Sequence, residues 1–291
     1  MSCAYSTSFD TLMQKPPSDA VLEQKLDWSC VQDNVVVCVF ANRGYGTLLR
    51  HWLLTAARAG CHKPLVFCLD EETARICEQA GVLHHLVPFT GDWLGFMRHQ
   101  MRVTRDVLAL GYAPLVTDID AIWLRDPIPF TLSHTQDVVF SPGTLQPPEA
   151  HAAWGNVLCF GYFLLRPTAA VQWLLDQVLP LMETAGDQPV INRFLLTQGL
   201  NFESTSLYPM PFRGKDVLQS RETRTGIVGD LSVALLPNRL IQRLPEPDEP
   251  EPLVIHPITP KVEKAKIAHF KEIGLWFEDL MREPEPISEM R

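Results

Sequence analysis

Residues 115–127 are Leu-Val-Thr-Asp-Ile-Asp-Ala-Ile-Trp-Leu-Arg-Asp-Pro, and this stretch is the best guide to both fold and site. Its apolar approach ends in Asp118 and Asp120, which a single aliphatic residue separates. On an extended backbone, side chains two residues apart point to the same face, so the two carboxylates are expected to converge. A divalent cation would compensate their charge, and oxygen ligands favour Mg²⁺ or Mn²⁺. A solvated strand end is the simpler alternative, because Asp-x-Asp is a short and common pattern.

Composition excludes several classes of function. The 291 residues, 46% hydrophobic and 20% charged, are typical of a soluble globular protein of one large or two small domains. A net charge of −9 argues against a nucleic-acid or anionic-membrane binder. Any anionic substrate would therefore need a local basic site or a metal.

Cysteine usage and hydropathy bear on location. The seven cysteines contain no Cys-x-x-Cys pair, and Cys38 and Cys68 lie in apolar runs, which favours buried thiols in a reducing compartment. Residues 1–30 lack a secretory-signal pattern, and the longest apolar run, 157–165, is too short to span a bilayer. We predict a cytoplasmic protein without a transmembrane segment.

A strand–helix alternation precedes the two aspartates. Strands are expected at 35–40, 65–69, 83–87 and before Asp118, with helices at 47–59, 71–80 and 96–110 between them. This order predicts a mostly parallel sheet with helices on both faces. Ligands of such sheets bind beyond the carboxyl ends of the strands, where Asp118 and Asp120 would lie.

The rest of the chain continues the same fold. Residues 200–230 are expected to be irregular, residues 245–252 to form an acidic, proline-rich loop, and residues 260–273 to form a Lys-rich helix. We predict one domain over residues 34–280, with a lead-in at 1–33 and a tail at 281–291. Shorter elements are expected as strands at 137–140, 157–165, 233–236 and 253–256, and as helices starting at Thr168 and Asp187.

Three later groups of residues could form a site together with the two aspartates. His256 ends a short apolar strand, where a structural or exposed histidine is the usual case. Four lysines follow it, which are either a solvated helix face or phosphate contacts: Lys261, Lys264, Lys266 and Lys271. Asp187 and Gln188 open a helix, where N-capping is the simpler role. Four other side chains are expected to be structural: His84, His85, Met101 and Cys159.

Taken in order, these residues resemble the nucleotide-diphospho-sugar transferase domain of GT-A glycosyltransferases, and particularly glycosyltransferase family 77. The resemblance covers about residues 35–277. Besides 115–127, the matching segments are Asn42 to Trp52, Leu65 to Asp70, Gly111-Tyr112, Gly161 to Thr168, Asp187-Gln188-x-x-x-Asn192, His256 and Lys271 to Phe277. It implies the Rossmann-like GT-A fold.

The resemblance also implies roles for individual residues. Asp118, Asp120 and His256 would bind Mn²⁺ or Mg²⁺ and, through it, the donor diphosphate. Lys261 or Lys264 would contact phosphate. The remaining implied donor contacts are Asn42 and Tyr45 at the nucleotide base, Asp187 and Gln188 at the sugar, and Arg98 and Arg102 on the preceding helix.

The implied reaction moves a hexosyl or pentosyl group from a nucleotide-diphospho-sugar, with UDP-sugar the expected donor, to a hydroxyl with retention. The acceptor would be a glycan, a glycoprotein or a small metabolite. Two features depart from the family pattern. Cys159-Phe160-Gly161 replaces an Asn-Thr/Ser-Gly step, and the N-terminal helix that anchors many relatives in the Golgi is not evident. A Golgi-lumen location would follow if an anchor has been removed.

Two other classes of function share the Asp-x-Asp pattern. A haloacid-dehalogenase-like phosphatase carries it near the chain start, with Thr or Val where this chain has Ala121. A non-catalytic sugar-nucleotide-binding domain would bind donor and metal without turnover.

Overall fold

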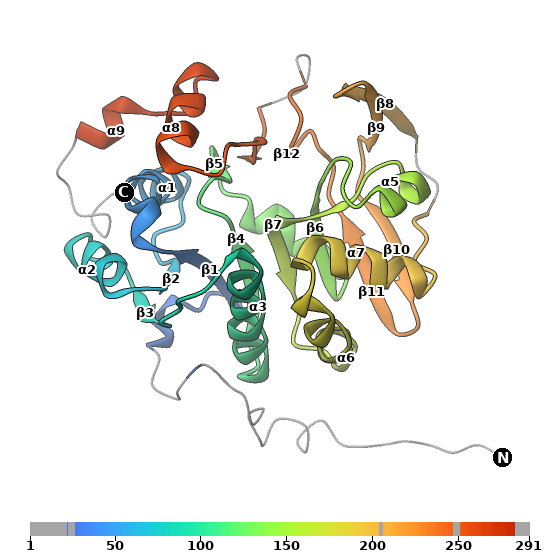
Figure 1. Ribbon diagram of the computed structural model, residues 1–291, viewed down its shortest axis with the longest axis horizontal. Coiled ribbons are helices and arrows are strands. Elements are labelled where there is room, and N and C mark those ends of the chain that lie inside the picture. Colours follow the sequence, from blue (N-terminus) through green and yellow to red (C-terminus); the bar gives the residue numbers. More distant parts are fainter. Residues whose placement is uncertain (1–21, 23–26, 204–205, 247–250, 283–291) are drawn as a thin grey trace.

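An eight-stranded sheet in the order β10-β11-β6-β7-β4-β1-β2-β3 runs through the molecule (Figure 1). The computed structural model describes residues 22, 27–203, 206–246 and 251–282. Most of the predicted lead-in and tail, and part of the proline-rich loop, therefore lie outside the described residues. The strands of this sheet are β1 (Val35–Ala41), β2 (Leu65–Cys68), β3 (His84–Leu86), β4 (Ala113–Thr117), β6 (Val138–Pro142), β7 (Leu158–Leu165), β10 (Arg224–Val228) and β11 (Leu231–Leu235).

Strand directions confirm the prediction of a mostly parallel sheet. Strands β4, β1, β2 and β3 are mutually parallel, and β11 is parallel to β6. The exceptions are β7, which is antiparallel to both β4 and β6, and β10, which is antiparallel to β11. Because β7 runs against β4, its middle lies beside the carboxyl end of β4.

Helices cover both faces of the sheet, as predicted (Figure 1). Every residue of β1 is buried, and successive side chains point into two different cores, which is why the strand is apolar throughout. One core contains α3 (Trp93–Ala109), α6 (Ala169–Val178) and α7 (Asp187–Thr197). The other contains α1 (Gly46–Arg58), α2 (Glu71–Gln79), α8 (Glu263–Glu272) and α9 (Glu278–Arg282). The shorter helices are η2 (Trp28–Cys30), η3 (Arg43–Tyr45), α4 (Ile128–Leu132), α5 (Pro148–Trp154) and η4 (Leu179–Glu183).

A second sheet of three short strands lies beyond the carboxyl end of β4. Its order is β12-β13-β5, with bounds Ile241–Gln242, Val254–Ile255 and Ile122–Trp123. Strand β13 is antiparallel to β5, and Ile255 pairs with Ile122. This pairing brings the chain around His256 to the segment that follows Asp120.

The expectation that residues 200–230 are irregular was wrong. They contain β10 and a hairpin of β8 (Leu207–Phe212) and β9 (Lys215–Ser220). Strand β8 contains Pro209 and Pro211, which the hairpin tolerates because it forms its own two-stranded sheet, where the unpaired edge needs no N–H donor. Arg213 and Gly214 form its turn with φ of 49° and 74°, both in the left-handed region that tight hairpins require.

Two helices begin away from their predicted starts. Helix α3 starts at Trp93 because the Asp92 carboxylate accepts a hydrogen bond from Gly95 N at 2.8 Å. Helix α8 starts at Glu263, so Lys261 lies before it. Lys264, Lys266 and Lys271 lie on the helix itself.

Candidate metal and donor site

Asp118 and Asp120 lie just beyond the carboxyl end of β4. Asp118 N donates to Gly161 O at 2.9 Å, which continues the β4–β7 pairing by one residue. The chain then turns, with Ala121 N donating to Asp118 O at 3.0 Å. The Trp52 indole of α1 donates to Ala121 O at 3.0 Å and fixes this turn from the core side. The two carboxylates therefore stand where ligands of parallel sheets bind.

His256 meets both carboxylates. It directly follows β13, and its backbone N–H donates to Gln242 O at 2.8 Å. Its Nε2 lies 3.7 Å from Asp118 Oδ2 and 3.5 Å from Asp120 Oδ1. One ligand atom from each of these three residues lies within 4.8 Å of the others. Residues more than 130 positions apart in sequence are thus brought together by the small sheet.

The space for the His256 ring depends on Gly161. A Cβ at Gly161 would overlap the imidazole, so only glycine permits the close approach of β7 to this histidine. Two residues earlier on β7, Cys159 Sγ lies 3.7 Å from His256 Nδ1. Arg243 donates to His256 O at 2.8 Å. The ring is held between β7 and the small sheet with Nε2 toward the aspartates.

Asp120 is also engaged from α8. Lys266 Nζ is ion-paired with Asp120 Oδ2 and donates to Thr259 Oγ1 at 2.8 Å. Thr259 Oγ1 in turn donates to the same Asp120 oxygen at 2.6 Å. The side chain of Asp120 is 9% accessible, whereas that of Asp118 is 44% accessible. The two carboxylates therefore differ: one is buried and paired, the other opens toward solvent.

The protonation of the site follows from these contacts. Burial opposes ionisation of Asp120, but the hydrogen bond and charge of His256 and the ammonium of Lys266 hold its pKa well below the usual range. Partial desolvation and then the charge of Asp120 raise the pKa of Asp118. Desolvation and Arg243 oppose protonation of His256, yet Asp120 and Cys159 raise its pKa to about 9. An ion bound at Nε2 would therefore displace a proton.

The three converging residues fit a hard divalent cation. Two carboxylate oxygens and one imidazole nitrogen are accepted ligands of Mn²⁺, and carboxylates are those of Mg²⁺. Three protein ligands leave coordination positions for diphosphate oxygens. Binding of an ion by these residues is a prediction that their convergence supports.

Asp187 and Gln188 lie at the first turn of α7, and Gly186, rather than Asp187, is its N-cap residue. Asp187 is 8% exposed and accepts a hydrogen bond from Gln188 N at 2.6 Å. Desolvation above all, with the charges of Asp118 and Cys159, raises the pKa of Asp187 to about 7. Gln188 Nε2 donates to Gln146 O at 2.7 Å. The charge of Asp118 thus acts on Asp187.

The residues predicted at the nucleotide base border the same region. Asn42 accepts a hydrogen bond from Gly44 N at 2.9 Å, which shapes the turn after β1. The Tyr45 hydroxyl donates to Lys261 O, and Lys261 Nζ lies 4.6 Å from the centre of the Trp93 ring. These contacts join the end of β1, the start of α3 and the chain after His256.

The structure does not pair the other predicted donor contacts with the aspartates, among the residues that it describes. Lys264 is exposed on α8, and Arg98 forms an ion pair with Glu183 at 3.8 Å. Arg102 is half-buried on α3. None of these three has a described contact with Asp118, Asp120 or His256.

Three residues at the site were not assigned to it from sequence. Lys266 is one of the four lysines that follow His256, and the sequence does not distinguish it from the other three. Cys159 is expected from sequence to be structural, although it lies at the departure from the family pattern. Thr259 carries no sequence signal, because a lone threonine in a loop is ordinary.

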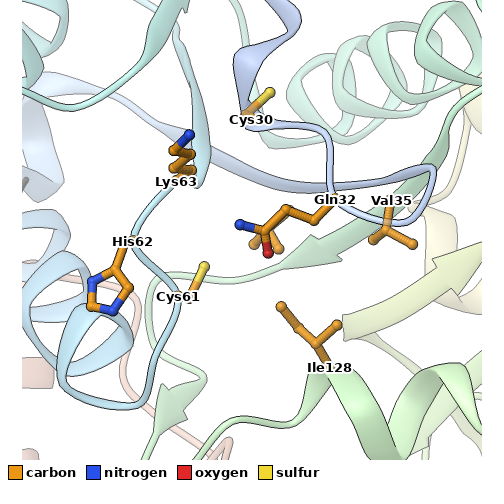
Figure 2. A pocket seen from close by; sticks show the side chains of 8 residues that line it. Cys30, Gln32, Val35, Cys61, His62, Lys63 and Ile128 are labelled. Atoms are coloured by element: carbon orange, nitrogen blue, oxygen red, sulfur yellow. The ribbon is translucent and has the colours of Figure 1, made fainter. Parts of the chain in front are cut away.

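A separate pocket lies at the opposite end of the strands, near the amino end of β1. Figure 2 shows it near the start of β1, with side chains from the first turn, the loop before β2 and α4 around it. Its lining residues are Cys30, Gln32, Val35, Val37, Cys61, His62, Lys63 and Ile128. It contains none of the residues predicted for catalysis or donor binding.

No helix within the described ranges is both long and apolar enough to cross a membrane.

Sequence comparison finds plant relatives. The chain is 26% identical over 188 residues to arabinosyltransferase RRA2 of Arabidopsis thaliana, which covers 55% of this chain and 44% of the relative. It is 23% identical over 193 residues to the β-arabinofuranosyltransferase RAY1 of the same plant, covering 61% of this chain and 36% of that protein. The chain thus spans less than half the length of these curated relatives.

Structural comparison supports the fold. The apo form of the glycosyltransferase GlyE from Streptococcus pneumoniae TIGR4 superposes with a TM-score of 0.52 at 14% identity, covering 87% of this chain and 61% of that one. This likeness confirms the predicted GT-A architecture.

The nucleotide-diphospho-sugar transferase family matches residues 60–256, about two thirds of the chain, from the loop before β2 to His256. The matched range contains Asp118, Asp120, Asp187 and His256. This match does not support the phosphatase alternative. The chain belongs to the nucleotide-diphospho-sugar transferase family.

Proposed function

We propose that this protein is a metal-dependent glycosyltransferase, related to glycosyltransferase family 77, that moves a sugar from a nucleotide-diphospho-sugar to a hydroxyl acceptor with retention. The convergence of Asp118, Asp120 and His256 within 4.8 Å at the carboxyl end of β4 carries the proposal. Two carboxylates and an imidazole at the ligand-binding edge of this fold have the chemistry of a diphosphate-chelating metal centre.

The chain's own groups have distinct tasks in this reaction. A bound Mn²⁺ or Mg²⁺ would neutralise charge on the departing diphosphate. Lys261, ahead of α8, offers an exposed ammonium for phosphate, and Asn42 and Tyr45 border the nucleotide. Asp187, buried at the first turn of α7, would face positive charge as it develops on the sugar ring.

Retention follows if the acceptor attacks from the leaving-group face. The bond from the anomeric carbon to the diphosphate oxygen breaks, the bond to the acceptor oxygen forms, and the acceptor proton passes to the departing diphosphate. No protein nucleophile is needed in this scheme.

We propose that the transferred sugar is a pentose. RRA2, RRA1 and RAY1 are all named as arabinosyl- or arabinofuranosyltransferases, at 23–27% identity to this chain. We therefore propose a UDP-arabinose as donor and a hydroxyl of a glycan, a glycosylated protein or a small metabolite as acceptor.

The test is donor hydrolysis with Mn²⁺ across a panel of nucleotide sugars that includes UDP-arabinofuranose and UDP-arabinopyranose. We expect release of one pentose in the wild type and loss of activity by at least about 100-fold in Asp120→Asn, because a buried ligand is removed. Asp126→Asn is the matched control, since Asp126 is an exposed aspartate of the same stretch, and its carboxylate accepts a hydrogen bond from Ile128 N rather than facing the site. Equal turnover in D120N and D126N would contradict the proposal. Donor binding without turnover across the panel would instead indicate a non-catalytic domain.

A further inference from the structure

Lys266 is a buried ammonium whose carboxylate partner is also a candidate metal ligand. Its side chain is 12% accessible and is ion-paired with Asp120 Oδ2, which Thr259 also approaches. The other oxygen, Asp120 Oδ1, lies 3.5 Å from His256 Nε2. Both oxygens of Asp120 are therefore engaged by groups of this chain.

A divalent ion at Asp120 would lie close to this ammonium. Two like charges separated by a few ångströms in a water-poor site repel each other strongly. Within the part of the chain that the structure describes, Asp120 is the carboxylate ion-paired with Lys266. A buried ammonium that loses such a partner needs another anion, because an unpaired buried charge is costly.

The surroundings of Lys266 indicate which anion that is. Lys266 Nζ lies 5.9 Å from the centre of the Tyr45 ring, which borders the proposed nucleotide position. The nearby Glu263 carboxylate already accepts a hydrogen bond from Leu48 N at 2.9 Å, at the start of α1. The donor diphosphate would supply negative charge to this space.

We infer that Lys266 and a divalent ion compete for Asp120, and that Lys266 turns to a donor phosphate when the ion binds. Lys266 would then couple the two ligands: the ion binds weakly alone and more tightly with a diphosphate. Such coupling is reciprocal, so the ion strengthens diphosphate binding by the same factor. This inference rests on the proposed function.

The test is Mn²⁺ affinity, measured by calorimetry without nucleotide, in wild type, Lys266→Met and Lys271→Met. K266M should bind Mn²⁺ at least about tenfold more tightly, because the competing charge is gone. K271M removes the same charge from the same helix, but Lys271 is half exposed and paired with Glu278 at 2.6 Å. The Mn²⁺ affinity of K271M should therefore equal that of wild type. An unchanged affinity in K266M, or an equal gain in K271M, overturns the inference.

UDP serves as the diphosphate probe for the coupling. At saturating UDP the Mn²⁺ affinity of wild type should rise by a larger factor than that of K266M. No effect of UDP on wild type, or an equal effect on both proteins, overturns the coupling. The melting temperature gives a second readout: Mn²⁺ should raise that of K266M more than that of wild type, since Asp120 is left unpaired without the ion.

Asp120→Asn separates this inference from the proposed function. Mn²⁺ binding that survives in D120N contradicts the metal site itself, whatever K266M does. Mn²⁺ binding that is lost in D120N and unchanged in K266M leaves the metal site standing and removes only the role of Lys266.

Discussion

Asn192 and Leu158 exchange two hydrogen bonds: Leu158 N donates to Asn192 Oδ1, and the Asn192 amide donates to Leu158 O, each at 2.9 Å. The same amide donates to Gln188 O at 2.8 Å. Asn192 is fully buried, and it ties the first turn of α7, with Asp187, to the strand that carries Cys159 and Gly161.

We therefore expect Asn192→Leu to destabilise the fold and reduce turnover. The three hydrogen bonds of this side chain are lost, and the buried N–H and C=O of Leu158 are left without these partners, which should lower the free energy of unfolding by about 2–4 kcal/mol. Urea unfolding and donor hydrolysis measure the two effects. Gln172→Leu is the control, because its amide donates to Asp176 at the exposed surface of α6. Similar losses in both variants would show that the buried link has no special role.

Gly161→Ala should weaken metal binding through His256. The added methyl overlaps the imidazole, so the ring must leave its place opposite the aspartates. We expect at least about a tenfold loss of Mn²⁺ affinity, as for a displaced ligand. The matched test is a double-mutant cycle with His256→Ala: once the ring is absent, Gly161→Ala should cost no further affinity. Additive losses in the double variant would contradict this explanation.

Cys159→Ala should also reduce Mn²⁺ affinity, by roughly tenfold, because partners of a ligating histidine set its orientation. When Nε2 faces an ion, the proton lies on Nδ1, which faces Cys159 Sγ at 3.7 Å. Cys159→Ser keeps an acceptor there and should restore part of the affinity. Cys61→Ala, at the pocket of Figure 2, should leave Mn²⁺ binding unchanged. A loss in C61A equal to that in C159A would remove the positioning role.

His51 should make stability depend on pH. The imidazole is fully buried, stacks on Trp276 with ring centres 4.3 Å apart, and accepts a hydrogen bond from Phe277 N at 3.2 Å through Nε2. Desolvation and then the charge of Arg58 lower its pKa to about 4.

The sign follows from the lowered pKa. His51 takes up its proton near pH 6.5 in the unfolded chain and near pH 4 in the folded chain. Its contribution to the free energy of unfolding is therefore complete above pH 6.5 and is lost as the pH falls toward 4. The loss should be on the order of 2–3 kcal/mol. Urea unfolding of wild type and His51→Phe across pH 4–7 measures the difference. A difference between the two proteins that does not change with pH would contradict the assignment.

Sequence predicts the Asp-x-Asp position well because it depends on local rules. An apolar strand followed by two carboxylates places Asp118 and Asp120 at a sheet edge, and the strand–helix alternation identifies which edge. The choice of lysine depends on which face of α8 packs toward the site, since residues two apart on a helix point about 200° away from each other. In the structure that face carries Lys266, which pairs with Asp120, and Lys264 is exposed.

The contacts of Cys159 and Thr259 could not be predicted, because they depend on non-local packing. These contacts form when β13 pairs with β5 and β7 packs against His256. The sequence does not predict the β8–β9 hairpin for a related reason: among the described residues it is a separate two-stranded sheet, and its unpaired edge tolerates the prolines of β8.

The small sheet β12-β13-β5 also has a consequence for folding. Its pairing joins segments that are about 130 residues apart, and Lys266 meets Asp120 across 146 residues. Contacts of such long range form late, since their loop-closure entropy must be overcome first. During synthesis the aspartates leave the ribosome long before His256, so the site stays incomplete until the segment that carries His256 and Lys266 has also emerged. A nascent chain that ends before this segment therefore exposes two carboxylates without their partners, and we expect Mn²⁺ binding to be acquired late in assembly.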